Sequence, residues 1–133
     1  MIVPFLVDTN IFIYARDGRY TVREKFNENE HDILLSALSL AELQRGLDAR
    51  EPDAPLRAQR HDLLIRRVSV VPFDAAAARA YGDVIRHKGR VKARDFDHLI
   101  AAHALSLGAV LVTNNLPDFS GIPGLSLENW AQP

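Results

Sequence analysis

The stretch Ile2-Val3-Pro4-Phe5-Leu6-Val7-Asp8-Thr9-Asn10 begins with an apolar run and ends in three polar residues. A short, continuous apolar run is typical of a strand that is buried on both faces, as in a parallel sheet. Asp8, Thr9 and Asn10 are all suitable helix caps, and apolar residues that fit a helix follow them. The stretch therefore predicts a buried strand that leads directly into a helix, with Asp8 at the junction.

The same alternation continues along the chain. Further strands are expected at residues 33–37, 68–71 and 109–113, with a short fifth strand at 125–127. Helices are expected from residue 11, from Ser39, over 56–67, after the cap Asp74, and over 95–107 before Gly108. Residues 16–30 are either a second short helix or a loop. Strands that alternate with helices indicate an α/β fold in three layers, with a mostly parallel sheet covered on both faces.

The totals fit a single domain over residues 1–133 and exclude several kinds of site. The 133 residues are 47% hydrophobic and 25% charged, which is ordinary globular composition. No cysteine is present, so disulfides, thiolate zinc sites and cysteine nucleophiles are excluded. The net charge of −1 gives no overall attraction to nucleic acid. The first residues lack the basic region of a signal peptide, so we expect a cytoplasmic protein without a membrane anchor.

Acidic residues from distant parts of the sequence fall where the predicted strands end. Asp8 directly follows the first strand, Glu42 lies one turn into the helix after the second, and Asp97 lies in the first turn of the helix before the fourth. Open parallel sheets bind ligands outside the carboxyl ends of their strands. Like charges brought together need a cation, and oxygen ligands favour Mg²⁺ or Mn²⁺ over Zn²⁺. The sequence therefore predicts a metal site of three carboxylates.

Each acid also has a purely structural explanation. Asp8 is a good cap for the first helix. Ser39 and Glu42 have the spacing of a capping box, in which the glutamate bonds back to the start of the helix. Asp95 and Asp97 would each stabilise a helix N-terminus through its dipole.

Two histidines on the same predicted helix are candidates for further metal ligands. His98 and His103 are five residues apart, so they point in different directions around a helix. We expect them in the core or at the surface rather than on an ion.

Four segments occur in a familiar order, namely Leu6–Asn10, Ser39–Leu43, Asp97–Ala104 and Leu111–Asn115. With the ending from Leu116 to Trp130, they resemble the PIN-domain family over essentially the whole chain, and specifically the VapC toxins of bacterial toxin–antitoxin pairs. The resemblance implies a PIN-like domain with a central sheet of four to five strands flanked by helices. It also implies a metal-dependent endoribonuclease that hydrolyses phosphodiester bonds in tRNA or rRNA. A VapB-like antitoxin and a second copy of the chain are the implied partners.

By motif, Asp8, Glu42 and Asp97 match the acidic metal ligands of this family, so the resemblance makes them catalytic residues that bind Mg²⁺, or Mn²⁺ as a substitute. Asp95 lies two residues too early for this role and is expected to begin the helix. The side chains expected to orient these carboxylates by hydrogen bonds are Thr9, Thr113 and Asn115.

One position departs from the family pattern. Asn115 stands where many PIN domains have an aspartate, and Asp118 is the candidate for a fourth acidic group. The departure leaves an alternative open, in which the chain is a catalytically inactive PIN-like module that binds RNA or a protein. Another metal-dependent phosphoesterase, acting on small molecules, is a third interpretation.

A basic segment precedes Asp97. Its cations are Lys88, Arg90, Lys92 and Arg94. Such a run is either a solvated, flexible linker or, next to the carboxylates, a set of RNA phosphate contacts. The sequence does not decide between these interpretations. If the cations contact RNA phosphates, RNA binding should weaken with added salt.

Overall fold

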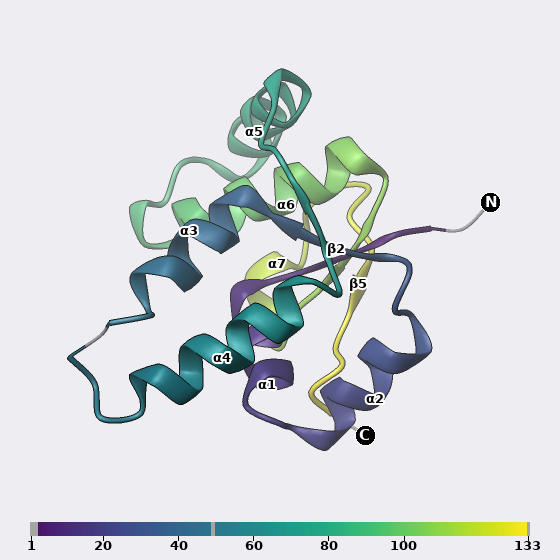
Figure 1. Ribbon diagram of the computed structural model, residues 1–133. Coiled ribbons are helices and arrows are strands. Elements are labelled where there is room, and N and C mark those ends of the chain that lie inside the picture. Colours follow the sequence, from purple (N-terminus) through teal and green to yellow (C-terminus); the bar gives the residue numbers. More distant parts are fainter. Residues whose placement is uncertain (1–2, 49, 133) are drawn as a thin grey trace.

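The computed structural model describes residues 3–48 and 50–132, in which strands and helices alternate (Figure 1). The strands are β1 (Phe5–Val7), β2 (Ile33–Ser36), β3 (Ser69–Val71), β4 (Val110–Val112) and β5 (Leu127–Glu128). The helices are α1 (Thr9–Arg16), α2 (Tyr20–Glu28), α3 (Ala37–Arg45), α4 (Ala54–Ile65), α5 (Ala75–Lys88), α6 (Asp95–Leu107) and α7 (Leu116–Phe119), with a short 3₁₀ helix η1 (Lys92–Arg94). Ile2, the first residue of the expected first strand, lies outside the described residues.

The strands form one sheet in the order β3-β2-β1-β4-β5, and every neighbouring pair is parallel. From β1 the chain moves to β2 and β3 on one side, and then crosses to β4 and β5 on the other. The strand order therefore reverses between β1 and β4, which is where parallel sheets of this kind form a ligand-binding crevice. Asp8 directly follows β1 and Thr113 directly follows β4, so both lie at this crevice.

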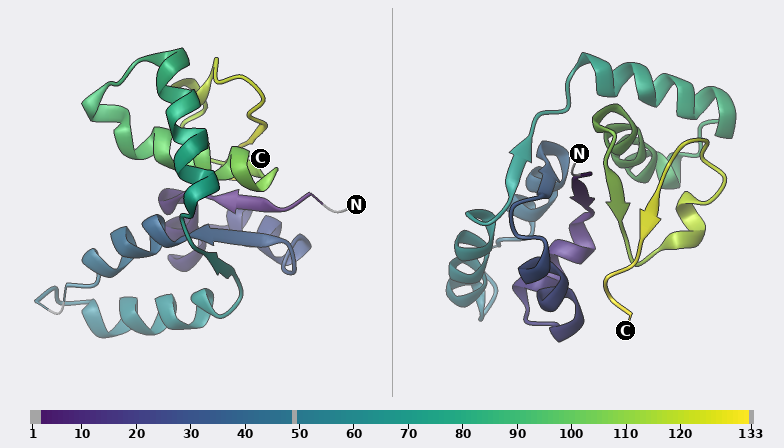
Figure 2. Two further views of the ribbon diagram at one scale, coloured as in Figure 1. Left: turned by 90° about the horizontal axis from the view of Figure 1, so that it is seen from above. Right: turned by 90° about the vertical axis from the view of Figure 1, so that its right-hand side faces the viewer.

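Side chains of β1, β2 and β4 alternate between two hydrophobic cores, as the pleat of a strand requires. Val7 and Val112 belong to the core that includes residues of α1, α2 and α4, while Leu6 and Leu111 belong to the core that includes residues of α5 and α6. Figure 2 shows the two groups of helices on opposite faces of the sheet. In the first core, the rings of Trp130 and Phe5 pack together with their centroids 5.2 Å apart.

The expected three-layer α/β architecture is confirmed, and the sheet has five strands, all parallel. The segment that was left open between helix and loop contains the helix α2. The last strand lies at Leu127–Glu128, so the expected range 125–127 was wrong by two residues at its start and by one at its end. No helix in the described ranges is long and apolar enough to cross a membrane.

The expected start of α3 was wrong. The helix begins at Ala37, and the hydroxyl of Ser36 accepts a hydrogen bond from the amide of Leu38 at 3.1 Å. Ser36 still pairs with Val71 across the sheet, so its extended backbone has the conformation that an N-cap requires. The capping box of Ser39 with Glu42 is therefore absent, and the Glu42 carboxylate is available to another partner.

The basic segment, for which a flexible linker was one of two interpretations, has helical structure at both of its ends. Helix α5 includes Lys88, and Lys92–Arg94 form η1, so three residues lie between these elements. Gly89 ends α5 with φ of 75°, a backbone conformation that glycine adopts without strain.

Candidate active site

One pocket at the carboxyl ends of β1 and β4 contains all three predicted acids. It has an empty volume of about 540 Å³ and is lined by Asp8, Thr9, Asn10, Glu42, Phe96, Asp97, Ile100 and Phe119. We call it the carboxylate pocket. Its acids come from the β1–α1 junction, from α3 and from α6, so the fold brings together side chains that are far apart in the sequence.

Asp8 is both a helix cap and a member of this pocket. Its Oδ1 accepts a hydrogen bond from the amide of Ile11 at 2.9 Å, and its own amide donates to the carbonyl of Val112 at 2.9 Å. Burial raises the pKa of Asp8, and the charges of Asp97 and Glu42 raise it further, against hydrogen bonds that lower it. The expected cap is therefore confirmed, and it does not exclude a role in the pocket.

Glu42 is fixed by a side chain from another element. The hydroxyl of Thr9 donates to Glu42 Oε1 at 2.6 Å, which ties α3 to the first turn of α1. The guanidinium of Arg45 lies 3.8 Å from Oε2 of the same carboxylate. This hydrogen bond is the contact through which Thr9 would orient the Glu42 carboxylate.

Asp97 occupies the first turn of α6 and faces the other acids. Its pKa is raised by burial, by the charge of Asp118 and by Glu42, while His98 and Arg94 act in the opposite direction. Burial and neighbouring acids therefore outweigh the nearby positive charges at Asp97.

Asp95, in the same helical turn, has different surroundings. It accepts a hydrogen bond from the hydroxyl of Tyr81, and Arg90 Nη2 lies 3.2 Å from its Oδ2. Both contacts lower the pKa of Asp95. Asp95 begins α6, so its expected place at the start of this helix is confirmed.

The residues after β4 form a small polar cluster beside the pocket. Thr113 is buried; its hydroxyl accepts from the amide of Asn115 at 3.0 Å, and its hydrogen bond lowers the pKa of Asp8. The side-chain amide of Asn115 donates to Asp118, and Arg94 lies 3.1 Å from the other oxygen of Asp118. Asp118 is thus held next to Asp97 without lining the pocket, and its role as a fourth acid stays a prediction.

Both histidines of α6 lie in the interior, as expected. His98 and His103 are each 1% exposed. Nδ1 of His103 is 2.9 Å from the Ser36 hydroxyl, and burial lowers the pKa of His103. Neither side chain lines the carboxylate pocket.

Four lining residues were missed by the sequence analysis: Asn10, Phe96, Ile100 and Phe119. Ile100 is one helical turn after Asp97, so the helical spacing contained a signal for it. Phe119 belongs to α7, a helix that no sequence pattern predicted, and an aromatic residue such as Phe96 is usually assigned to the core.

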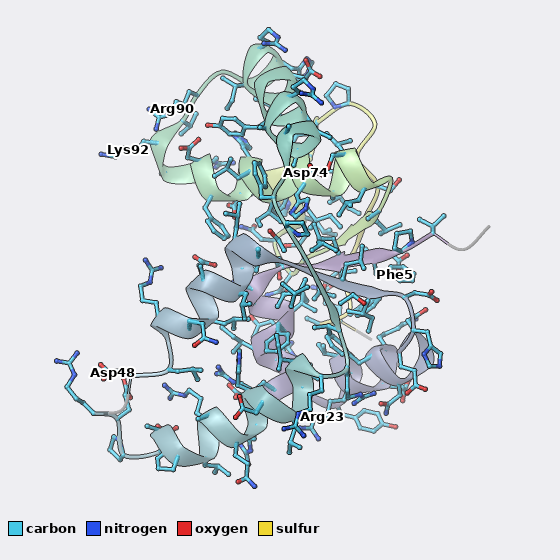
Figure 3. All side chains as sticks on the ribbon, turned by 45° about the horizontal axis from the view of Figure 1, so that its top comes forward. Phe5, Arg23, Asp48, Asp74, Arg90 and Lys92 are labelled. Atoms are coloured by element: carbon cyan, nitrogen blue, oxygen red, sulfur yellow. The ribbon has the colours of Figure 1, made fainter. Side chains whose placement is uncertain are left out.

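The predicted RNA-binding cations lie around the start of α6, and Figure 3 shows Arg90 and Lys92 extending outward from the fold. Arg90 and Arg94 are each paired with an aspartate. Lys88 Nζ donates to the carbonyl of Ser120 at 3.3 Å. Within the described ranges, Lys92 forms no ion pair. The role of these cations in binding RNA stays a prediction.

The chemistry of the donors fits a hard divalent cation. In the part of the chain that the structure describes, no three acidic or imidazole groups lie close enough together to hold an ion jointly. Mg²⁺ retains several of its waters and needs only one or two carboxylates, so it suits such spacing. Burial, together with the neighbouring acids, raises the pKa values of Asp8 and Asp97, and a cation held between these carboxylates would stabilise their charged forms.

Comparisons with known proteins agree over nearly the full length of the chain. The family described as "PIN domain" matches residues 5–123. The chain is 34% identical to the tRNA(fMet)-specific endonuclease VapC of Shigella flexneri, with 97% of this chain and 99% of that protein covered. It is 35% identical to ribonuclease VapC2 of Rickettsia felis, with 95% and 97% covered.

Solved structures give the same result for the fold. DNA-bound VapBC from Salmonella typhimurium superposes with a TM-score of 0.83 at 33% identity, covering 97% of this chain and 99% of that chain. VapBC2 from Rickettsia felis, bound to a DNA fragment from its promoter, gives 0.83 at 30% identity, with 96% and 99% covered.

Proposed function

The chain belongs to the PIN-domain family, as a member of VapC type, and from this premise we propose that it is a divalent-metal-dependent endoribonuclease acting at the carboxylate pocket. The observation that carries the proposal is the arrangement of Asp8, Glu42 and Asp97 around one pocket where the strand order reverses. PIN-domain VapC nucleases generally depend on divalent metal ions. We propose Mg²⁺ for this chain, with Mn²⁺ as a substitute, because all the available donors are oxygens.

The three acids perform two different tasks in the proposed reaction. Asp8 and Asp97 hold the ion, directly or through its waters. When bound, the ion supplies positive charge that polarises a phosphate oxygen and lowers the pKa of a water. Glu42, held by the Thr9 hydroxyl, orients the attacking water or accepts its proton. Attack by water on phosphorus leaves a 5′-phosphate and a 3′-hydroxyl.

Neutral groups around the pocket keep the carboxylates in position. Thr113 bonds to Asp8, and Asn115 bonds through its backbone amide to Thr113 and through its side chain to Asp118. Partners of this kind fix the orientation of metal-binding groups and raise their affinity.

The proposed substrate is tRNA or rRNA, since relatives at this level of identity are named as tRNA-specific or general ribonucleases. Acidic groups alone repel RNA, so cations must lie next to them. The proposed phosphate contacts are Lys88, Arg90, Lys92 and Arg94. Because phosphate binding releases counterions, RNA affinity is expected to fall steeply with added salt.

The proposed partners are a VapB-like antitoxin, which inhibits the nuclease, and a second copy of the chain. The solved VapBC complexes, which match this fold over nearly all of the chain, support the antitoxin as a partner.

A second candidate is an inactive PIN-like module that binds RNA or a protein without cleaving it. Asn115 supports this candidate, because its neutral amide replaces an acid and is engaged with Asp118. The three acids at one pocket favour the nuclease.

The deciding experiment is incubation of the purified chain with total RNA, in Mg²⁺ and in a chelator, followed by mapping of the new ends. The nuclease proposal expects cleavage in Mg²⁺, loss of cleavage in the chelator, and 5′-phosphate ends. Binding of RNA without cleavage under all conditions would establish the inactive module instead. Cyclic phosphate ends would exclude attack by water.

A further inference from the structure

A second pocket adjoins the carboxylate pocket and shares two of its side chains. It has an empty volume of about 490 Å³ and is lined by Leu38, Ala41, Glu42, Arg45 and Phe96. Glu42 and Phe96 also line the carboxylate pocket, so they form the boundary between the two. We call this second hollow the side pocket. It lies between α3 and the first turn of α6.

The side pocket is mostly apolar inside, and its two charged lining residues, Glu42 and Arg45, lie 3.8 Å apart at one edge. Leu38 and Phe96 are partly buried and pack against the core beneath α6, which fixes the position of the Phe96 ring. Ala41 is exposed and leaves the pocket open on the α3 side. The Arg45 side chain is 81% exposed, so its guanidinium can reach a charged ligand outside the pocket.

We propose that the side pocket binds one unstacked nucleobase of the RNA substrate, adjacent to the bond that is cleaved. The inference rests on the proposed nuclease function, because the scissile phosphate must then lie at the carboxylates. The base attached next to that phosphate lies within reach of a pocket that shares Glu42 and Phe96 with the cleavage site. In this arrangement Phe96 contacts the base and Arg45 contacts a flanking phosphate.

The chemistry of the lining favours a base over other occupants. Proteins that recognise single-stranded RNA turn bases outward and stack them on aromatic side chains or guanidinium planes. An apolar interior suits the flat faces of a base, and the exposed cation complements the phosphate beside it. An apolar side chain of a protein partner would also fit the interior, but an RNA whose phosphate lies at the carboxylates brings a base next to this pocket in every bound complex.

The test uses a short single-stranded RNA that spans the cleavage site mapped in total RNA. Each nucleotide next to the cut is replaced in turn by an abasic one, which keeps the phosphate and sugar and removes the base. In the wild-type protein, one abasic position is expected to lower kcat/KM by about tenfold, a value in the lower half of the range found for aromatic stacking of a base.

Two variants alter the side pocket while leaving all three acids in place. Phe96→Leu keeps apolar volume but removes the ring, and Ala41→Met fills the pocket from an exposed position. Gln44→Met is the matched control, since Gln44 is exposed on the same helix and lines neither pocket. Both pocket variants should cleave the intact RNA about tenfold less efficiently and should no longer distinguish it from the abasic RNA. Gln44→Met should behave as the wild type.

The possible results distinguish a failure of the base-binding inference from a failure of the proposed nuclease function. If the wild-type protein cleaves RNA but the abasic penalty persists undiminished in Phe96→Leu and Ala41→Met, the side pocket holds no base and the nuclease proposal stands. The same conclusion follows if no abasic position has a penalty. If the wild-type protein cleaves no RNA, both proposals fail together. A general loss of folding would slow cleavage without abolishing the distinction between intact and abasic RNA.

Discussion

Asp95 and Asp97 lie two residues apart in one turn of α6, and their electrostatic surroundings are opposite. Asp95 points to the Tyr81 hydroxyl of α5 and to the guanidinium of Arg90, which follows α5, and both lower its pKa. Asp97 points into the carboxylate pocket, where burial and neighbouring acids raise its pKa. The same residue type in the same helical turn is therefore stabilised as an anion in one place and destabilised as an anion in the other.

The difference separates a structural acid from a candidate functional one. The paired charge of Asp95 contributes to the stability of the fold. The poorly compensated charge of Asp97 reduces stability, and strained electrostatics of this kind are concentrated at functional sites. Four changes test this contrast, from the largest expected effect to the smallest.

Neutralising each acid in turn should affect cleavage very differently. Asp97→Asn is expected to lower kcat/KM for RNA in Mg²⁺ by about a thousandfold, because stabilisation of transition-state charge by a metal site is worth several kcal/mol. Asp95→Asn should stay within about tenfold of the wild type, since it removes no group from the pocket. The measurement is initial cleavage rate against RNA concentration. Comparable losses in the two variants would contradict the contrast.

Removing the hydroxyl that holds Glu42 should have an intermediate effect. Thr9→Val deletes the 2.6 Å hydrogen bond to Glu42 and is expected to lower metal affinity or activity by about 10- to 100-fold. Mg²⁺ titration of the cleavage rate measures both quantities. Thr21→Val is the matched control, because the Thr21 hydroxyl bonds to the carbonyl of Ala131, outside the pocket. An effect of equal size in the control would show that Thr9 has no special role.

Breaking the contact between α5 and Asp95 should change stability rather than chemistry. Tyr81→Phe is expected to lower the free energy of unfolding slightly, because it removes a hydrogen bond to the Asp95 carboxylate near the surface. Urea unfolding measures the loss, and kcat for RNA should be unchanged. Tyr20→Phe, at a tyrosine that is 75% exposed, is the control and should leave stability within error. A large fall in kcat for Tyr81→Phe would place Asp95 in the active site.

The smallest expected effect has the opposite sign. In a chelator at neutral pH, Asp97→Asn should raise the free energy of unfolding by about 0.5–1 kcal/mol, since it removes an unfavourable charge. The pKa of Asp97 is higher in the folded chain than in the unfolded chain, so the cost of its charge is full at neutral pH and disappears as pH falls through the raised pKa. The advantage of the variant should therefore shrink with falling pH.

Asp95→Asn provides the reverse case in the same urea experiment. The pKa of Asp95 is lowered by folding, so its contribution is present above the ordinary aspartate pKa and is lost as pH falls through the lowered value. This variant should be less stable than the wild type at neutral pH. If Asp97→Asn is also less stable there, burial does not disfavour the Asp97 charge.

Local patterns in the sequence were sufficient for the layers and for the position of the acids. The buried runs that end at Val7 and Val112 are followed at once by Asp8 and Thr113, so the ends of the strands locate the pocket. The choice between Asp95 and Asp97 came from family resemblance, because helical spacing places both in the first turn. The packing of α6 against α5 determines which of them faces the pocket, and no local pattern describes that packing.

Other features could not be predicted, because the sequence contains either two equivalent signals for them or none. Ser36 and Ser39 are both suitable caps, and pairing of Ser36 across the sheet decides between them. Helix α7 has four residues, too few for a periodic signal. The side pocket was not predicted, since Phe96 is adjacent to Asp97 in the sequence and its exposed face is created by the position of α3.

Because β1 lies between β2 and β4, the carboxylate pocket cannot form before β4 has been synthesised. A chain still attached to the ribosome that has been synthesised only as far as α5 contains Asp8 and Glu42, but neither Asp97 nor the β4 carbonyl that receives the Asp8 amide. The proposed nuclease therefore becomes complete only after α6 and β4 have been synthesised. Until then, the translating ribosome and its bound tRNAs are not exposed to an active enzyme tethered to them.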